Sequence, residues 1–215
     1  MYDIRHVWVW TPNSLELVYF IATFYRMSNI IPWRQKDTDN FSTSMEVWNA
    51  LLSQIPKAKV FDPCFHDGLA ATNIAGCGHI PVHECKDFLN PRYVVPEYDL
   101  LATNPPFSDP KSFLRRIVDI TLINRKPFAV LLPVASQESK YFGLQFGRLA
   151  HVGEVVEIQV LSLGKMGKMF IGPDLTPTRK GRGTMWFVHG LSLADTSGIL
   201  FVDGNRAGTH VWSQD

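Results

Sequence analysis

Apolar residues along the chain form short continuous runs that alternate with segments of helical periodicity. Continuous runs, which predict strands, lie at 58–61, 79–83, 99–102, 128–134, 155–161 and 184–191. Helices are expected between them at 43–55, 68–75 and 112–124. This alternation predicts an α/β fold with a Rossmann-like, doubly wound and mostly parallel sheet.

The chain on either side of this alternation has a different pattern. Residues 26–42 are polar and predict a loop, so we assign 1–42 to an N-terminal extension. Thr43-Ser44-Met45-Glu46 fits a capping box, in which the Thr43 and Glu46 side chains satisfy free amides at the start of a helix. The expected domain then spans 43–195, and 196–215 is expected to be a C-terminal tail.

Composition and cysteine content restrict the class of protein. With 215 residues, 46% apolar and 19% charged, the chain matches a single globular domain. Three cysteines, an odd number, favour a reducing intracellular compartment, cytoplasmic or nuclear, over a disulfide framework. The N-terminus has no signal-peptide pattern and the apolar run Leu15–Tyr25 is too short to span a membrane, so no membrane partner is expected.

Basic residues gather in one segment although the chain as a whole is nearly neutral. The formal net charge of +1 gives no support to a strongly basic nucleic-acid binder. Segment 164–183 is rich in Gly and Pro, predicts a long loop, and has Asp174 as its one acid. Its cations are Lys165, Lys168, Arg179, Lys180 and Arg182. They are candidates for contacting nucleic-acid phosphates, and a solvated loop is the alternative.

Six residues with zinc-binding side chains also lie close together: Cys64, His66, Cys77, His79, His83 and Cys85. Their pairs are separated by a single residue, whereas structural zinc sites use wider pairs. We therefore expect no metal and interpret the cysteines as buried apolar residues.

The first segment with candidate chemistry is Asp62-Pro63-Cys64-Phe65-His66-Asp67-Gly68. It follows a predicted strand and precedes a predicted helix, and ligands in doubly wound sheets bind at the carboxyl ends of strands. An acid there can hold an ammonium group, and glycine lets the backbone approach a ligand closely. Taken alone, the segment is equally compatible with a tight turn that binds nothing.

The second segment, Asn104-Pro105-Pro106-Phe107, also follows a predicted strand. Consecutive prolines remove two backbone donors, which leaves the Asn104 side-chain oxygen and the Pro105 carbonyl as acceptors. An exocyclic amino group offers two donors to such a corner, and Phe107 provides a flat surface on which a base can stack. A rigid proline turn is the alternative interpretation.

The two segments together resemble the class I amino-methyltransferases, since Asn104-Pro105-Pro106-Phe107 begins 36 positions after Gly68. The resemblance runs from about Thr43 to about Leu191. It implies the class I methyltransferase fold, S-adenosyl-L-methionine as cofactor, and methyl transfer to an amino nitrogen. In that family the first segment binds the methionine part of the cofactor and the second is the catalytic tetrapeptide.

The resemblance also implies roles for single residues. Asp62, followed by Pro63, would contact the amino-acid end of the cofactor, and Gly68 would open the helix beneath it. Glu84 matches the acid that binds the ribose hydroxyls. Three further cofactor contacts are implied, with Asp87 at the adenine amino group, Phe88 beside the ring, and Thr43 near the cofactor.

One position departs from the family pattern, which has glycine where this chain has His66. A side chain there is expected to crowd the cofactor or to shift the loop. The leading prediction is an S-adenosylmethionine-dependent N6-adenine methyltransferase acting on nucleic acid, with DNA preferred over RNA. The alternatives are a protein glutamine N-methyltransferase and an inactive scaffold subunit. Because the chain is short, target recognition is expected to depend on the loop 164–183, the N-terminal segment or a partner subunit.

Overall fold

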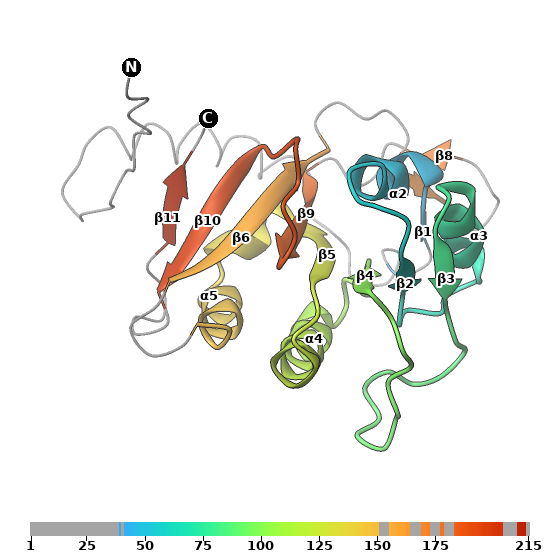
Figure 1. The fold of residues 1–215 in the computed structure, drawn as a ribbon, viewed down its shortest axis with the longest axis horizontal. Helices are drawn as coiled ribbons and strands as arrows, with labels where there is room; N and C mark the ends of the chain where they lie inside the picture. Colours follow the sequence, from blue (N-terminus) through green and yellow to red (C-terminus); the bar gives the residue numbers. More distant parts are fainter. Residues whose placement is uncertain are drawn as a thin grey trace.

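The computed structural model describes residues 39, 41–150, 155–163, 169–172, 177–178, 183–203 and 210–213. Its main sheet consists of β2 (Lys59–Phe61), β3 (Ile80–Val82), β4 (Leu100–Thr103), β5 (Phe128–Pro133), β6 (Val155–Ser162), β9 (Thr184–His189), β10 (Gly198–Asp203) and β11 (His210–Ser213). These strands lie in the order β11-β10-β6-β9-β5-β4-β2-β3 (Figure 1). β9 and β10 run opposite to the other strands, so the expected α/β fold with a mostly parallel sheet is confirmed.

Helices cover both faces of this sheet, as a doubly wound fold requires. α4 (Pro110–Asn124) and α5 (Lys140–Gly147) lie on one face, and α2 (Met45–Leu52) and α3 (Leu69–Gly76) lie on the other (Figure 1). A short 3-10 helix, η1 (Val134–Glu138), connects β5 to α5. The long helix α4 begins where Asp109 accepts a hydrogen bond from the Ser112 amide at 3.2 Å, with Pro110 in the first turn.

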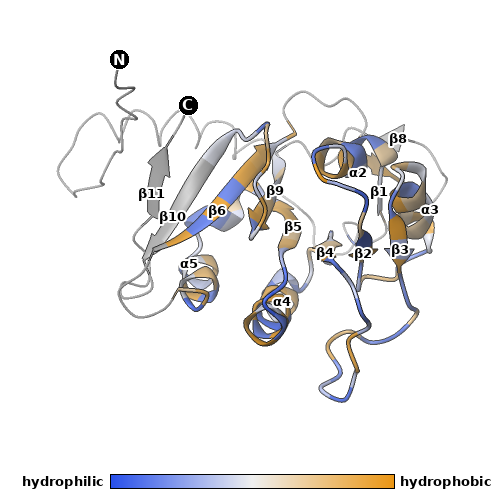
Figure 2. Ribbon diagram, in the orientation of Figure 1, coloured by the Kyte–Doolittle hydropathy of each residue, from blue (hydrophilic) through white to orange (hydrophobic). Residues whose placement is uncertain are grey.

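Alternate residues of the central strands enter two separate cores. In β5, Val130 and Leu132 pack in the core beneath α4 and α5, whereas Ala129 and Leu131 pack in the core beneath α2 and α3. Successive side chains of a strand point to opposite faces, so a strand covered on both sides is apolar throughout. Figure 2 shows this as orange colour in β5.

Several parts of the fold differ from the expectation. The segment 196–215 contributes β10, which pairs with β6, and β11, which pairs with β10, so the expected boundary at 195 does not separate a tail from the sheet. The expected loop 164–183 contains β7 (Phe170–Ile171) and β8 (Pro177–Thr178). These two strands form a small antiparallel sheet with β1 (Ser42–Thr43), in the order β1-β7-β8.

The expected capping box is replaced by another arrangement. Ser44 is the N-cap of α2, and no side chain caps the helix there. Thr43 belongs to β1, and its hydroxyl contacts Asn104 instead of a helix amide. The expected N-terminal extension lies outside the described residues except for Asp39, Phe41 and Ser42.

The strand order creates a switch point between β2 and β4. From β2 the chain crosses to β3 on one side, whereas β4 and then β5 lie on the other side. Connections that diverge in this way leave a crevice at the carboxyl ends of the two strands. Asp62 follows β2 and Asn104 follows β4, so both predicted segments meet at this point.

Candidate functional site

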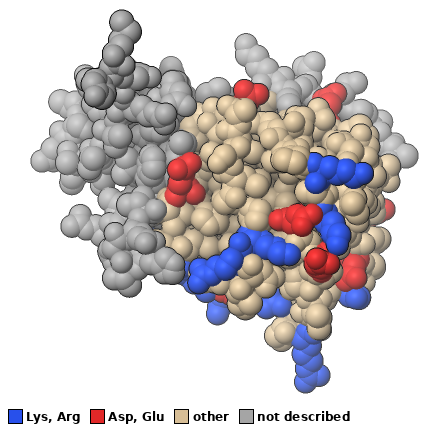
Figure 3. Space-filling model, viewed as in Figure 1, with Lys and Arg blue, Asp and Glu red and all other residues tan. Residues whose placement is uncertain are grey.

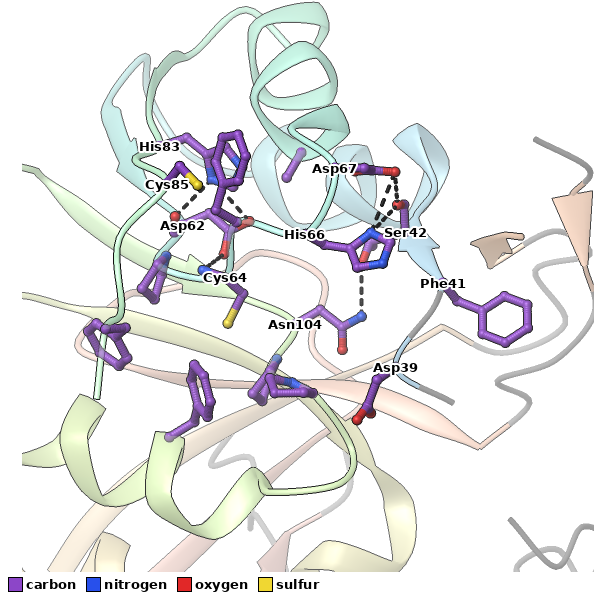
Figure 4. A pocket seen from close by; sticks show the side chains of 18 of the residues that line it. Asp39, Phe41, Ser42, Asp62, Cys64, His66, Asp67, His83, Cys85 and Asn104 are labelled. Atoms are coloured by element: carbon purple, nitrogen blue, oxygen red, sulfur yellow. Dashed lines mark hydrogen bonds and ion pairs between the residues drawn. The ribbon is translucent and has the colours of Figure 1, made fainter. Parts of the chain in front are cut away.

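A cavity of about 600 Å³ lies at the switch point (Figure 4). This volume is in the range of small-molecule and cofactor sites. Asp62 and Pro63 line the cavity from the end of β2, and Asn104-Pro105-Pro106-Phe107 lines it from the end of β4. Three more of the predicted residues line it, namely Thr43, Asp87 and Phe88.

Asn104 lines this cavity and has one acceptor without a partner among the described residues. Its Nδ2 donates a hydrogen bond to Thr43 Oγ1 at 3.0 Å, which fixes the orientation of the amide. Its Oδ1 is buried and has no hydrogen-bond partner among the described residues. Buried acceptors are normally paired, so Oδ1 is suited to a donor supplied by a ligand.

Asp62 is a buried carboxyl group held by three contacts. Its Oδ1 accepts hydrogen bonds from Thr103 Oγ1 at 2.5 Å and from the Cys64 amide at 3.1 Å. Its Oδ2 lies 3.6 Å from His83 Nδ1. Burial raises the pKa of Asp62 to about 6, against the opposing effects of Thr103, His83 and the Cys64 amide. Asp62 therefore gains or loses its charge near neutral pH.

Burial also raises the pKa of the neighbouring Cys64 thiol well above its usual range, and the nearby Asp62 adds to this effect. The Cys64 thiol is therefore protonated at neutral pH. Since the thiolate is the reactive form of cysteine, Cys64 is a packing residue in this loop.

His66, the departure from the family pattern, is turned toward β1. Its Nδ1 lies 3.3 Å from Ser42 Oγ and 3.6 Å from Asp67 Oδ2 (Figure 4). Ser42 Oγ donates to Asp67 Oδ2 at 2.5 Å. Burial raises the pKa of Asp67, but the hydrogen bonds from Ser42 and the Leu69 amide, together with His66, outweigh it and leave this pKa below its usual value. Asp67 is therefore a carboxylate at neutral pH.

Aromatic side chains form much of the remaining wall. Phe107 and Phe170 meet edge to face, with ring centroids 6.2 Å apart and planes at 89°. Phe65 stacks on His83 with centroids 4.7 Å apart. Phe41 and Phe113 also line the cavity. Such walls suit a flat, partly apolar ligand.

Two of the predicted cofactor residues are not brought to the cavity wall. Glu84 Oε2 accepts a hydrogen bond from the Tyr93 hydroxyl at 3.0 Å and pairs with Lys86 Nζ at 3.0 Å. The hydrogen bonds from Lys86 and Tyr93 hold the pKa of Glu84 below its usual value. Gly68 is the N-cap of α3, with a φ of 80° that suits glycine.

The predicted phosphate-binding residues Lys165, Lys168, Arg179, Lys180 and Arg182 lie outside the described residues. On the face shown in Figure 3, lysine and arginine side chains of the described part are interspersed with aspartate and glutamate. Because positive and negative side chains are interspersed, the described residues on that face form no continuous basic stripe.

Of the six candidate zinc ligands, Cys64, His66, His83 and Cys85 line the cavity, whereas Cys77 and His79 do not. His79 uses both ring nitrogens, since Nε2 lies 3.1 Å from the Leu52 carbonyl and Nδ1 accepts from the Ala58 amide at 3.3 Å. In the part of the chain that the structure describes, no three His, Cys, Asp or Glu side chains are placed to hold a metal ion. None of the described helices is long and apolar enough to cross a membrane.

The cavity contains further residues for which no cofactor-binding role was predicted from the sequence. Asp67 lies in the segment after the strand predicted at 58–61, and His83 is the last residue of the strand predicted at 79–83. These positions at strand ends are the signal that could have found them. Ser42 and Phe170 belong to β1 and β7, which have two residues each. Strands that short leave no periodic pattern in the sequence, so the structure alone reveals these two.

Comparison with solved structures finds methyltransferases at low identity. A type I restriction-modification system methyltransferase subunit from Streptococcus thermophilus is 11% identical, with a TM-score of 0.40, over 83% of this chain and 48% of that protein. A TehB-like SAM-dependent methyltransferase from Corynebacterium glutamicum is 10% identical, with a TM-score of 0.37, over 84% of this chain and 100% of that one. A SAM-dependent methyltransferase from Thermotoga maritima, described as a possible histamine N-methyltransferase, is 10% identical, with a TM-score of 0.32, over 80% of this chain and 95% of that one.

The chain thus spans about half the length of the Streptococcus thermophilus protein. No family model and no curated protein matches its sequence. At these identities and TM-scores the likeness assigns neither an activity nor a substrate to this chain. Any assignment of activity or substrate therefore depends on the residues of the cavity.

Proposed function

We propose that this chain is an S-adenosylmethionine-dependent methyltransferase that acts on an exocyclic amino nitrogen, with adenine N6 in nucleic acid as its target. The observation that carries this proposal is the buried, unpartnered Oδ1 of Asn104, which lines the same cavity as the acidic Asp62. Asn104 Oδ1 suits a hydrogen-bond donor such as the target amine, and Asp62 suits a cation such as the cofactor. Methyl transfer from a sulfonium to an amine needs a place for each of these two groups.

The charges of the cavity support a cationic cofactor. Four aspartates line it, namely Asp39, Asp62, Asp67 and Asp87. Lys86 is the one lysine or arginine among the described lining residues, and Glu84 pairs with it at 3.0 Å. S-adenosylmethionine, when bound, supplies a methyl group on a sulfonium cation, and it also carries an ammonium group. Carboxylates attract both cations more strongly in a partly buried site than in water.

The target side of the site is Asn104-Pro105-Pro106-Phe107. Asn104 Oδ1 and the Pro105 carbonyl would accept the two hydrogens of the amine, which directs the nitrogen lone pair toward the methyl group. Phe107 would stack on the base, and Phe170 supports its ring edge to face. Holding the amine and methyl in line makes the displacement effectively unimolecular: the nitrogen–methyl bond would form as the sulfur–methyl bond breaks, which leaves a neutral thioether, and the amine would lose one proton to water. No covalent intermediate with the protein is needed.

The choice of a nucleic acid as substrate rests on the resemblance of the tetrapeptide and on the basic segment 164–183. A duplex substrate would require the adenine to be flipped out of the stack, which costs a few kcal/mol, whereas a single strand avoids most of this cost. We propose DNA ahead of RNA, with a partner subunit as one source of target recognition. A glutamine side chain is the alternative amide target.

Calorimetric titration of the purified protein with S-adenosylmethionine tests the proposal first. Saturable binding, followed by transfer of radiolabelled methyl groups to single-stranded DNA, duplex DNA or RNA, is the expected result. Transfer to a glutamine peptide alone would replace the nucleic acid as the target. Absence of binding at millimolar cofactor would overturn the proposal and favour an inactive scaffold subunit.

A further inference from the structure

His83 is a buried residue of the cavity that has no place in the proposed transfer step. It lies directly after β3, near Asp62 and Cys85 (Figure 4). Its side chain is 2% exposed. Its Nδ1 lies 2.9 Å from the main-chain oxygen of Asp62. A carbonyl oxygen can only accept a hydrogen bond, so Nδ1 must carry a proton. This contact fixes the tautomer of the ring.

In the neutral form of the ring, the other nitrogen is then an acceptor. In a neutral imidazole with its proton on Nδ1, Nε2 has a free lone pair. His83 Nε2 is buried and has no hydrogen-bond partner among the described residues. Phe65 stacks on the imidazole and shields it from water, yet Phe65 is itself 38% exposed and sits at the cavity wall. His83 and Phe65 both line the cavity, so a ligand bound there lies beside the imidazole.

The position of His83 along the sheet edge indicates which part of a ligand it meets. Asn104, Asp62 and His83 follow β4, β2 and β3, which are neighbours in the sheet. Neighbouring strands are about 4.8 Å apart, so His83 lies roughly 10 Å from Asn104 along this edge. With the methyl sulfonium at Asn104 and the amino-acid end at Asp62, as the family resemblance implies, the part of the cofactor that extends to β3 is its nucleoside.

The chemistry of the acceptor points to a neutral donor. An ammonium group is better held by carboxylates such as Asp62 and Asp67, whereas a neutral imidazole suits a hydroxyl. We propose that His83 Nε2 accepts a hydrogen bond from a ribose hydroxyl of the cofactor, the role that the family resemblance implies for Glu84. The proposal rests on the proposed function, and Glu84 is held away from this role by Tyr93 and Lys86.

Calorimetry with S-adenosylhomocysteine and its 2′-deoxy and 3′-deoxy analogues tests this assignment without turnover. The variant His83→Asn keeps an amide nitrogen in place of Nδ1 and has no atom in place of Nε2. Glu84→Gln is the matched control. The wild type is expected to bind one deoxy analogue roughly tenfold more weakly than the parent, the effect of one hydrogen bond lost in a buried site. His83→Asn should bind the parent roughly tenfold more weakly and no longer distinguish it from that analogue, while Glu84→Gln behaves as the wild type.

The outcomes separate this inference from the proposed function. If His83→Asn keeps the wild-type preference for the hydroxyl, or if Glu84→Gln loses it, His83 is not the acceptor, although the cofactor site stands. If the wild type binds neither S-adenosylmethionine nor S-adenosylhomocysteine, the proposed function and the role of His83 fail together.

A spectroscopic measurement covers the case in which His83→Asn does not fold. Nitrogen NMR of histidine-labelled wild-type protein should show the His83 proton on Nδ1 and a bare Nε2, whose resonance shifts when S-adenosylhomocysteine is added. The analogue that lacks the relevant hydroxyl should produce a much smaller shift. A proton on Nε2 in the free protein, or equal shifts with all three ligands, would overturn the proposal.

Discussion

The hydroxyl of Thr43 accepts a hydrogen bond from the side-chain amide of Asn104 at 3.0 Å, and this bond joins the small sheet to the end of β4. Because it uses the amide nitrogen, it leaves Oδ1 of Asn104 as the acceptor for a ligand. Thr43 is therefore a positioning residue for the proposed target site. The residue is itself anchored, since its main-chain oxygen accepts a hydrogen bond from Asn73 Nδ2 at 2.9 Å.

Replacing Thr43 by valine is expected to lower kcat for methyl transfer roughly tenfold, because one hydrogen bond that orients Asn104 is lost. Thr43→Ser keeps the hydroxyl and should stay close to wild type. The affinity for S-adenosylhomocysteine should not change in either variant. Steady-state transfer assays with calorimetry measure both quantities, and equal rates for the valine and serine variants would contradict the role of Thr43.

Asn104→Ala removes the acceptor itself and is expected to lower kcat by roughly a hundredfold or more, the size of the loss when one transition-state hydrogen-bonding group is deleted. Binding of S-adenosylhomocysteine should remain within a few-fold of wild type. If calorimetry instead shows that Asn104→Ala no longer binds this ligand, Asn104 belongs to the cofactor side of the cavity.

Cofactor affinity should depend on pH through Asp62. Burial raises the pKa of Asp62 to about 6, so the group is a carboxylate above that pH and neutral below it. The affinity for the cationic S-adenosylmethionine is therefore expected to rise between pH 5 and pH 7, by roughly tenfold for a single titrating group. Asp67 stays charged over this range, because its pKa lies below its usual value.

Asp62→Asn should abolish this rise and bind S-adenosylmethionine weakly at every pH. His66 and His83 also line the cavity, so His66→Ala is measured in parallel. Calorimetry from pH 5 to pH 7.5 gives the profiles. An unchanged profile in Asp62→Asn would show that Asp62 is not the source of the pH dependence.

The positions of the two chemical segments could be predicted because each comes directly after an apolar strand. Asp62 and Asn104 are far apart in sequence, but the alternation of strands and helices brings the carboxyl ends of β2 and β4 together. The strand β5 was predictable for the same reason, since a run buried on both faces is apolar throughout. Features determined by the periodicity of apolar residues were therefore accessible from the sequence.

Contacts of side chains that have two possible partners could not be predicted from the periodicity of apolar residues. Thr43 matches a capping pattern, yet its hydroxyl contacts Asn104, which lies 61 positions later. Glu84 has the residue type expected at a ribose, but Tyr93 and Lys86 hold its carboxylate. In both cases the local pattern allows two partners, and the tertiary structure selects between them. The sequence also contains no sign of β10 joining β6, because edge pairing has no local signature.

His66 is expected to have little effect on cofactor binding despite the family preference for glycine. Among the described residues Arg125 is the only non-glycine with a positive φ, so the backbone at His66 does not require glycine. The His66 side chain is 44% exposed and lies beside Ser42 and Asp67. His66→Ala should therefore bind S-adenosylmethionine within about fivefold of wild type, as for a partly exposed polar contact. Binding a hundredfold tighter would show that the ring occupies cofactor space.

Gly68 and Gly78 form a matched pair for separating stability from function. Their φ angles are 80° and 88°, and neither has a neighbour that an added Cβ would approach closer than 3.6 Å. Gly68→Ala and Gly78→Ala should each lower the free energy of unfolding by about 1–2 kcal/mol, the cost of an L-residue in the left-handed region. Gly68 begins α3 next to the Asp62 loop, so its variant alone should also weaken binding of S-adenosylmethionine. Thermal unfolding and calorimetry measure the two effects, and equal cofactor affinity in both variants would show that the start of α3 does not shape the site.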